Sequence, residues 1–243
     1  KKVNFFDAKK SKKICDIDLS QFNNQHGQYT TLKRSKLIEF LLKNIPKEKI
    51  IFNSELGDIK KPDKFILSFR DKNIEEFDYL IAADGVFSKA KQILFKKNGL
   101  PTYFNSIALR GNITNFEIFD ISLYLGPNFH FVIYPINQNN EFNFISIIKK
   151  ELIEKEIFNR KLFEDNSFIN SLLNQISSKS KINLNEIVRD IKCFPIFVSN
   201  KVQIPQLKNV FLTGDAFYSF PPSFAQGASQ SIEAANELYN ELK

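Results

Sequence analysis

Two short apolar runs that each end in an aspartate beside a glycine limit what this chain can fold into. The first run, residues 77–83, leads into Asp84-Gly85, and the second, residues 210–213, leads into Gly214-Asp215. A helical pattern follows each turn, so both regions predict a buried strand, a turn and a helix. Because ligands of open α/β sheets bind at the carboxyl ends of such strands, both turns are candidate ligand sites.

A purely structural interpretation of both turns stays open. The first segment can be a tight turn that the Asp84 side chain caps, with Ser88 as the N-cap of a helix over residues 88–95. In the second, the Pro221-Pro222 loop and the start of the last helix, residues 227–242, need no ligand. If a ligand is bound there, the backbone N–H groups and the positive end of that helix dipole would face an electron-rich group.

The middle of the chain has a different pattern. Strand-like segments separated by Asn, Gly and Pro turns predict a largely antiparallel sheet of four strands, at residues 104–113, 118–125, 129–136 and 142–148. One or two helices are expected over residues 151–177. The predicted fold class is therefore α+β, in which an antiparallel sheet is inserted into an α/β part with parallel strands.

Shorter elements complete this prediction. Residues 34–42 carry an apolar stripe that predicts an amphipathic helix, and Pro46 limits its end. Further strands are expected at residues 50–52, 64–69 and 191–198, whereas residues 1–31 are polar with only short apolar pieces.

Composition excludes several classes of protein. The only cysteines and histidines are Cys15, Cys193, His26 and His130, which are too few for a disulfide scaffold or a Cys/His metal centre. The net charge of +7 comes from short, dispersed lysine clusters, so we expect no nucleic-acid binding, and weak attraction to anionic membranes stays open. No apolar run is long enough to span a membrane. Cysteine usage predicts a reducing, cytoplasmic location, with peripheral association with the inner membrane as an alternative.

The chain has no methionine and begins with Lys1, so we expect residues to be missing upstream. Its eight glycines form neither a G-x-G-x-x-G fingerprint nor a phosphate loop, so no complete dinucleotide-binding unit can be built from the usual motif.

The second turn carries the most specific motif. Residues 214–229, GDAFYSFPPSFAQGAS, resemble without a gap the GD motif of the FAD-dependent aromatic hydroxylases, the p-hydroxybenzoate hydroxylase-like flavoprotein monooxygenases. That motif runs G-D-A-A-H-x-x-P-P-x-x-x-Q-G-x-N and is followed by an acidic residue, which is Glu233 here. Tyr218 replaces the usual histidine, and Ser229 replaces the asparagine.

Other segments resemble the same family. Residues 83–91 are similar to its DG motif A-D-G-x-x-S-x-x-R, with Lys91 in place of the arginine, and Arg34 with Leu37 is similar to its R-x-x-L helix start. Leu109-Arg110-Gly111 and Tyr134-Pro135 resemble strands of its substrate domain. The family also has a G-x-G-x-x-G unit before these motifs and a helical segment after them. We therefore expect an internal fragment, truncated at both ends, that binds FAD weakly or not at all by itself.

The resemblance implies a p-hydroxybenzoate hydroxylase-like fold. Residues 1–100 would be a partial FAD-binding domain, residues 101–200 a substrate-binding β-sheet domain with helices, and residues 201–243 the return to the FAD-binding domain. Asp215 would contact the ribityl and diphosphate region, and Arg34 the diphosphate. The remaining cofactor-binding residues implied are Asp84, Gly85, Gly214, Pro222, Gly227, Ala228 and Ser229.

The activity implied is NADH- or NADPH-driven hydroxylation of an aromatic or quinone-precursor ring with O2, through a flavin C4a-hydroperoxide. The flavin carries the chemistry, so no catalytic side chain is implied, although Pro222 could make a backbone contact on the substrate side. His130 either faces the substrate, a small aromatic or prenylated phenol, or is structural. Two alternatives stay open: an FAD-dependent reductase of isoprenoid chains, and a non-catalytic scaffold without flavin.

Overall fold

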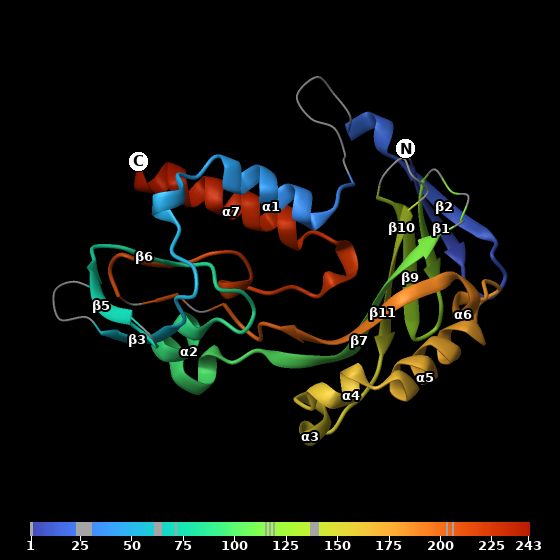
Figure 1. Cartoon of the computed structure of the whole chain (residues 1–243). Coiled ribbons are helices and arrows are strands. Elements are labelled where there is room, and N and C mark those ends of the chain that lie inside the picture. The colour runs from blue at the N-terminus through green and yellow to red at the C-terminus, as the bar shows by residue number, and fades with distance from the viewer. Residues whose placement is uncertain are drawn as a thin grey trace. The chain divides into compact units, whose positions relative to one another are not determined.

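The computed structural model describes residues 2–22, 31–60, 65–70, 72–114, 116, 118, 120–136, 141–202, 204–205 and 207–243. The chain forms two compact units (Figure 1). The first, called the sheet unit here, combines Lys1–Ile45 with Asn105–Ile196. The second, called the turn unit, combines Pro46–Phe104 with Phe197–Lys243.

The sheet unit is built on a seven-stranded sheet with the order β11-β7-β10-β9-β8-β1-β2. Its strands are β1 (Lys2–Asp7), β2 (Lys13–Asp18), β7 (Thr102–Thr114), β8 (Ile121–Leu125), β9 (Phe129–Pro135), β10 (Glu141–Lys149) and β11 (Val188–Val198). The four predicted antiparallel strands are confirmed as β7 to β10, whose neighbours pair antiparallel. The sheet has seven strands and not the predicted four, because β11, β1 and β2 extend it.

The added strands β1 and β2 come from the polar N-terminal region. β1 pairs parallel with β8 and antiparallel with β2. All six residues of β2 are exposed, which removes the alternation of buried and exposed positions that marks a strand in a sequence. Through this pairing, Lys1–Ile45 belongs to the sheet unit, while the functional division at residues 1–100, 101–200 and 201–243 stays a prediction.

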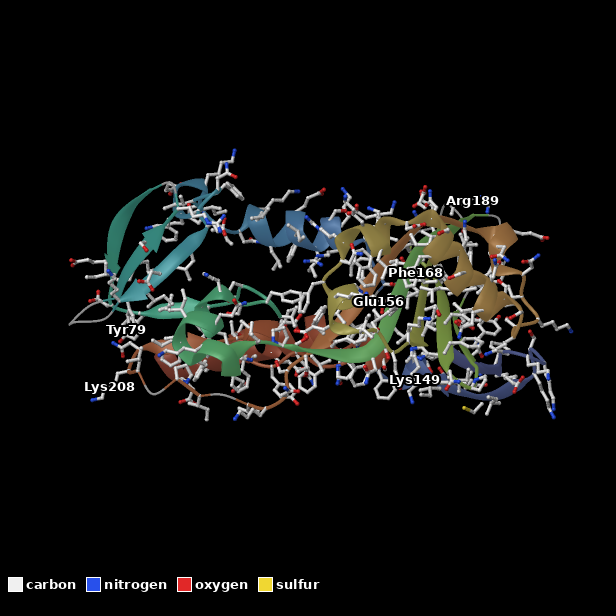
Figure 2. All side chains as sticks on the ribbon, turned by 90° about the horizontal axis from the view of Figure 1, so that it is seen from below. Tyr79, Lys149, Glu156, Phe168, Arg189 and Lys208 are labelled. Carbon is white, nitrogen blue, oxygen red and sulfur yellow. The ribbon has the colours of Figure 1, made fainter. Side chains whose placement is uncertain are left out.

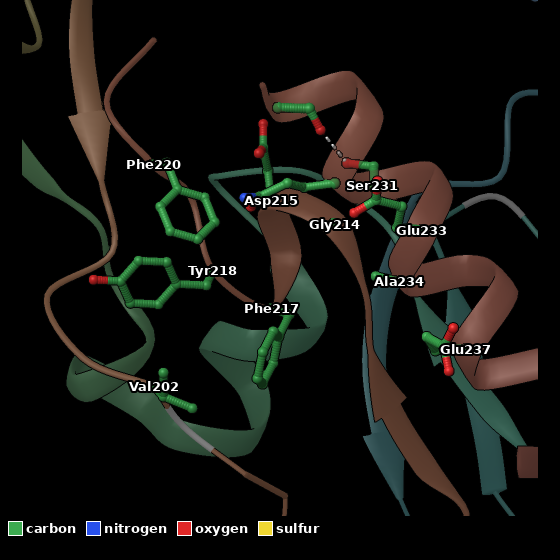
Figure 3. A pocket seen from close by; sticks show the side chains of 12 residues that line it. Val202, Gly214, Asp215, Phe217, Tyr218, Phe220, Ser231, Glu233, Ala234 and Glu237 are labelled. Carbon is green, nitrogen blue, oxygen red and sulfur yellow. Dashed lines mark hydrogen bonds between the residues drawn. The ribbon is translucent and has the colours of Figure 1, made fainter. Parts of the chain in front are cut away.

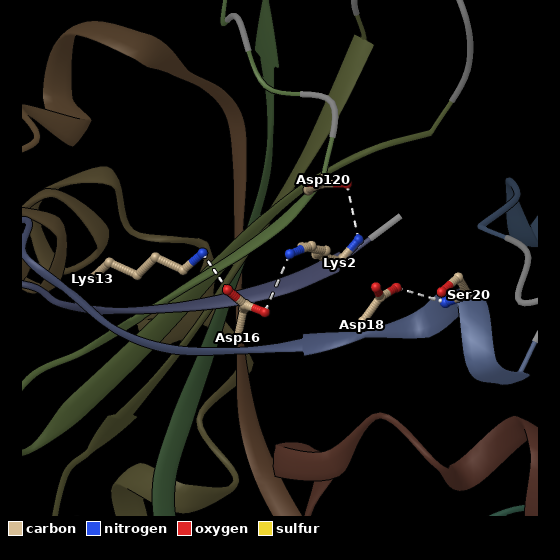
Figure 4. Close-up of polar contacts among 6 residues, drawn as sticks. All are labelled: Lys2, Lys13, Asp16, Asp18, Ser20 and Asp120. Carbon is tan, nitrogen blue, oxygen red and sulfur yellow. Dashed lines mark hydrogen bonds and ion pairs between the residues drawn. The ribbon is translucent and has the colours of Figure 1, made fainter.

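Polar contacts hold the hairpin of β1 and β2 (Figure 4). The Asp16 carboxylate forms ion pairs with Lys13 and with Lys2, the latter at 3.5 Å. The Lys2 backbone N–H donates to Asp120 Oδ1 at 2.9 Å, which ties β1 to the residue before β8. The hydrogen bond from Lys13 is the main cause that lowers the pKa of Asp16. Because these ion pairs are exposed, each of them contributes little to stability.

The core of the sheet unit lies on one face of the sheet. Buried and half-buried residues alternate along β9 and β10, as expected for strands with one buried face. Phe131 and Phe144 are fully buried, and Phe131 stacks on Tyr124 with ring centroids 4.7 Å apart. They belong to one cluster with Leu172 and Ile176 of helix α5 (Asn166–Ser177).

The remaining helices of the sheet unit are short. One or two helices were expected over residues 151–177, whereas the structure has three, α3 (Glu154–Ile157), α4 (Arg160–Glu164) and α5; α6 (Leu184–Ile187) precedes β11. Asp165 caps α5, since its carboxylate accepts the backbone N–H groups of Ser167 and Phe168. Phe168 of α5 is labelled in Figure 2. Its ring meets that of Phe163 of α4 edge to face, with centroids 6.1 Å apart. Helix α1 (Arg34–Lys43) confirms the predicted helix and has no buried residue.

The turn unit contains two small sheets. β6 (Leu80–Ala82) and β12 (Val210–Leu212) pair parallel, which confirms the predicted parallel strands. β3 (Leu56–Lys60), β4 (Phe65–Phe69) and β5 (Lys72–Phe77) form an antiparallel sheet, and 3-10 turns include η4 (Gly214–Ala216) and η5 (Pro222–Phe224). Helix α2 (Lys89–Phe95) follows β6, and α7 (Gly227–Leu242) ends the chain.

Two strand predictions in the turn unit were wrong. Residues 50–52 are not a strand, and Ile51 and Phe52 are 59% and 68% exposed; the strand is β3, which begins at Leu56. The apolar run of residues 77–83 is not one strand but is divided by a bend at Asp78 between β5 and β6. A segment forms a strand when a neighbouring strand pairs with it, as β4 pairs with β3. The three apolar residues 50–52 do not reveal by themselves whether such a partner exists.

No helix among the described residues is long and apolar enough to cross a membrane.

Candidate functional site

The first turn lies directly after β6. Gly85 has a φ of 83°, a conformation that favours glycine. The Ser88 backbone N–H donates to Gly85 O at 3.0 Å and closes the turn. Ser88 Oγ accepts the Lys91 N–H at 2.9 Å, and Asp84 Oδ2 accepts the Ala90 N–H at 3.1 Å. Both side chains therefore cap helix α2, in agreement with the structural interpretation of this turn.

The second turn lies directly after β12. Gly214 has a φ of 57°, and its carbonyl oxygen accepts the N–H groups of both Phe217 and Tyr218 at 3.0 Å. A Cβ on Gly214 would lie 3.0 Å from Ser231 Oγ of helix α7. This glycine therefore allows both the tight turn and the close approach of the helix.

The parallel pairing brings the two turns together. Leu212 pairs with Ala82, and one residue later the Thr213 N–H donates to Ala82 O at 3.0 Å. The chain turns away after both strands at the same sheet edge. Asp84 and Asp215 thus follow neighbouring strands, the arrangement in which open α/β sheets bind ligands.

Helix α7 begins close to the second turn. Ala225 has a left-handed φ of 53°, and Gln226 is the N-cap without a side-chain cap hydrogen bond. Ser229 Oγ donates back to Gln226 O at 3.0 Å. Because the Gln226 side chain makes no cap hydrogen bond, the first N–H groups of the helix are candidates for binding a ligand.

A pocket of about 510 Å³ lies between the second turn and helix α7 (Figure 3). Its walls are the backbone of the turn, an aromatic group after the turn, and one face of α7. The lining residues are Val202, Gly214, Asp215, Phe217, Tyr218, Phe220, Gly227, Gln230, Ser231, Glu233, Ala234 and Glu237. Tyr218 and Phe220 meet edge to face with centroids 4.8 Å apart.

Asp215 belongs to the second turn itself, and desolvation raises the pKa of its carboxylate although the residue as a whole is exposed. Glu233 and Glu237 add two carboxylates from α7. A pocket of apolar rings and hydrogen-bond acceptors suits a flat ligand that carries hydroxyl or N–H donors. No group of three potential metal ligands occurs within the described part of the chain, and His26 lies outside it.

The structure brings together some of the predicted cofactor-binding residues. Gly214, Asp215 and Gly227 line the pocket. Ala228 and Ser229 lie in the first turn of α7, and Pro222 lies in η5 on the loop that leads to it. Asp84 and Gly85 lie at the neighbouring turn. Arg34 is the exposed first residue of α1 and belongs to the sheet unit rather than to the turn unit.

His130 lies on β9 in the sheet unit. It is half-buried and falls on the face opposite Phe129 and Phe131, outside the core cluster. Burial lowers the pKa of its imidazole, which favours the neutral form.

Several pocket residues were not predicted. Gln230, Ala234 and Glu237 follow Gly227 at helical spacing, so they could have been found from the predicted helix. No sequence pattern marks the other three pocket residues, Val202, Phe217 and Phe220. They reach the pocket through the path of the irregular chain after β11 and after η4.

No family model matches the chain, although it is similar in sequence to curated FAD-dependent monooxygenases. The FAD-dependent monooxygenase eupB of Phoma sp is 24% identical over 219 residues, covering 84% of this chain and 49% of that protein. The 3-amino-4-hydroxybenzoate 2-monooxygenase PtmB3 of Streptomyces platensis is 23% identical over 219 residues, covering 85% of this chain and 53% of that protein. The chain thus spans about half the length of the curated relatives it matches.

Solved structures show the same fold. HpxO of Klebsiella pneumoniae, complexed with FAD and uric acid, superimposes with a TM-score of 0.78 at 16% identity over 96% of this chain and 60% of that one. A salicylate hydroxylase substrate complex superimposes with a TM-score of 0.75 at 16% identity, covering 95% of this chain and 60% of that one. The chain therefore has the fold of the flavin-dependent aromatic hydroxylases and is related in sequence to FAD-dependent monooxygenases.

Proposed function

We propose that this chain supplies part of the FAD site of a monooxygenase that hydroxylates a small aromatic ring. The observation that carries the proposal is the shared pocket of Gly214, Asp215 and Gly227, formed where a strand-end turn meets an uncapped helix start. The sequence relatives support FAD as the cofactor. One structural neighbour binds uric acid, another is a salicylate hydroxylase, and one relative is a 3-amino-4-hydroxybenzoate 2-monooxygenase, which together support an aromatic or heteroaromatic substrate.

The residues present fit FAD. Gly214 would let the cofactor approach the backbone closely, and the Asp215 carboxylate would accept hydrogen bonds from cofactor hydroxyls. The desolvation that raises the pKa of Asp215 would be offset by such donors, which favour the ionised form. Ser229, Ala228 and Gly227 would offer N–H groups and the positive helix end to the ring system, where negative charge grows on reduction.

The other predicted residues have outer roles in this proposal. Arg34 would bind the diphosphate, Asp84 and Gly85 would lie near the cofactor, and Pro222 would offer a backbone contact toward the substrate. The turn unit would hold most of the cofactor, and the sheet unit would take the substrate, with His130 among the groups that could face it.

The chemistry that FAD supplies when bound is the reduction of O2 with electrons from NADH or NADPH. One oxygen atom enters the ring as a hydroxyl, and the other leaves as water. The protein's task is to hold the cofactor, exclude water around the reacting groups and orient the ring. A cytoplasmic location and weak attraction to anionic membranes stay predictions.

The test is FAD titration, followed by flavin fluorescence, on the full-length protein and its variants. We expect Asp215→Ala to weaken FAD binding by one to two decades, since each lost hydrogen bond to a cofactor hydroxyl costs roughly 1–3 kcal/mol. Tyr218→His, which restores the residue usual in the family it resembles, should leave FAD binding intact. Glu241→Ala, on an exposed part of α7 outside the pocket, is the matched acidic control.

Thermal melts of the apo forms accompany the titration. Asp215 is exposed, so Asp215→Ala should melt close to the wild type. Wild-type FAD affinity in Asp215→Ala would refute the assigned role. A full-length protein that binds no flavin at all would favour the non-catalytic scaffold.

A further inference from the structure

A buried lysine whose hydrogen-bond partners among the described residues are uncharged lies next to the pocket in the turn unit. The Lys91 side chain belongs to α2, and the residue is 5% exposed. Its Nζ donates to the Phe217 carbonyl oxygen at 3.1 Å and to Ser199 Oγ at 3.4 Å. Among the salt bridges of the described residues, none includes this amine. Burial of an amine without a carboxylate is costly, so its hydrogen bonds must offset that cost.

The second partner of Lys91 extends the contact into a network. Ser199 Oγ also accepts the Ser219 backbone N–H at 3.0 Å, and the Ser199 N–H donates to Ser219 O at 3.0 Å. Ser219 Oγ donates to Phe197 O at 3.4 Å. Lys91 and Ser199 therefore join three segments of the turn unit: helix α2, the chain just after β11, and residues 217–219.

Residues 217–219 connect the second turn to the aromatic wall of the pocket. Their first part is held by the Gly214 carbonyl, which accepts the N–H groups of Phe217 and Tyr218. Their second part is held by Lys91 and Ser199. Phe217, Tyr218 and, one residue further on, Phe220 all line the pocket. The aromatic wall thus has one anchor at the turn and one anchor at α2.

We propose that Lys91 is a positioning residue, whose ammonium group holds the Phe217 carbonyl and thereby sets where the aromatic wall stands relative to Asp215. An aliphatic residue could fill the volume of the lysine stem, but it would leave the Phe217 carbonyl without this donor. Arginine would restore N–H donors, although its planar fork cannot copy the compact ammonium group. The consequence for FAD binding rests on the function proposed above, whereas the position of the wall does not.

These 243 residues contain no tryptophan, so Tyr218→Trp places a tryptophan reporter in the wall, and its emission is read as the difference from the same protein without Tyr218→Trp. In this background, Lys91→Met should shift the emission of the apo protein to longer wavelength and increase quenching by acrylamide, because the wall loses its anchor. Lys91→Arg should restore much of both signals. Lys89→Met is the matched control, since Lys89 is exposed two residues earlier on the same helix.

Ser199→Ala is the second variant, in case Lys91→Met fails to fold, and it should give a smaller change in the same direction. FAD titration on Lys91→Met without the reporter should show about a tenfold loss of affinity, the scale of one hydrogen bond to a charged donor. Unchanged emission and quenching in folded Lys91→Met and Ser199→Ala would overturn the positioning role. Absence of FAD binding in the wild type would instead refute the proposed function, and the apo fluorescence would still decide the role of Lys91.

Discussion

Asp84 and Ala90 are joined by a hydrogen bond in which the Ala90 backbone N–H donates to Asp84 Oδ2 over 3.1 Å. This bond places the carboxylate of the first turn over the start of helix α2. Negative charge at that end is favourable because the helix dipole is positive there. The same carboxylate is a cofactor-binding candidate, so its two roles must be separated experimentally.

We expect Asp84→Ala to lower the free energy of unfolding by about 1 kcal/mol, the usual cost of losing a helix cap. Asp84→Asn keeps an acceptor oxygen and should lose less stability. If Asp84 also contacts FAD, both variants bind FAD more weakly. Denaturant melts and FAD titrations of the two variants distinguish the roles, and unchanged FAD affinity in Asp84→Asn would leave the carboxylate as a cap only.

Lys91 should make stability depend on pH in the alkaline range. Burial lowers the pKa of its amine below the ordinary value of 10.5 in the folded protein. Between the lowered pKa and 10.5 the unfolded chain binds more protons than the folded one, so the free energy of unfolding rises with pH in this window. Lys91→Met should show a smaller rise than Lys89→Met, measured by urea unfolding at several pH values. Equal slopes in the two variants would contradict the prediction.

Gly111 should tolerate no side chain. A Cβ at this position of β7 would lie 2.6 Å from Val188 Cγ1 and 2.8 Å from the Arg189 carbonyl oxygen on β11. Gly111→Ala should therefore cost about 1–3 kcal/mol of stability, the range for an overpacked core. Gly227→Ala is the control, because nothing lies within 4 Å of its Cβ position. Equal melting temperatures for the two variants would show that β11 can move away from β7.

The two cysteines should differ in reactivity. Cys15 is exposed on β2, whereas Cys193 is buried in β11, and burial raises the pKa of the Cys193 thiol to about 12. Because the thiolate is the reactive form, a thiol reagent at neutral pH should modify Cys15 alone in the native protein and both residues after denaturation. Cys15→Ser should abolish the native reaction. Rapid native labelling of Cys193 would mean that β11 opens readily.

The central strands were predictable because the alternation of apolar and polar residues that marks a strand lies within each segment of the sequence. β9 and β10 alternate buried and half-buried residues, and helix α7 begins at Gly227 and ends at Leu242, as predicted. Ser88 was likewise expected as an N-cap, since capping depends on residues within one helical turn.

Strands that depend on distant partners were not predictable in the same way. β2 exposes all its residues and exists through its pairing with β1, while residues 50–52 are apolar but have no strand to pair with. Sheet pairing is set by neighbours that are close in space and far apart in the chain.

By itself, the amino-acid sequence determined the local units of this protein: the glycine turns at Gly85 and Gly214 and the helices that follow them, α2 and α7. It also determined the resemblance through which Asp215 and Gly227 became candidates. Only the tertiary structure decided that Val202 and Phe220 share a pocket with them, and that Lys91 is buried against the Phe217 carbonyl. The physical reason is range, because capping and turn formation act within a few residues, whereas burial and pocket shape depend on which distant segments pack together.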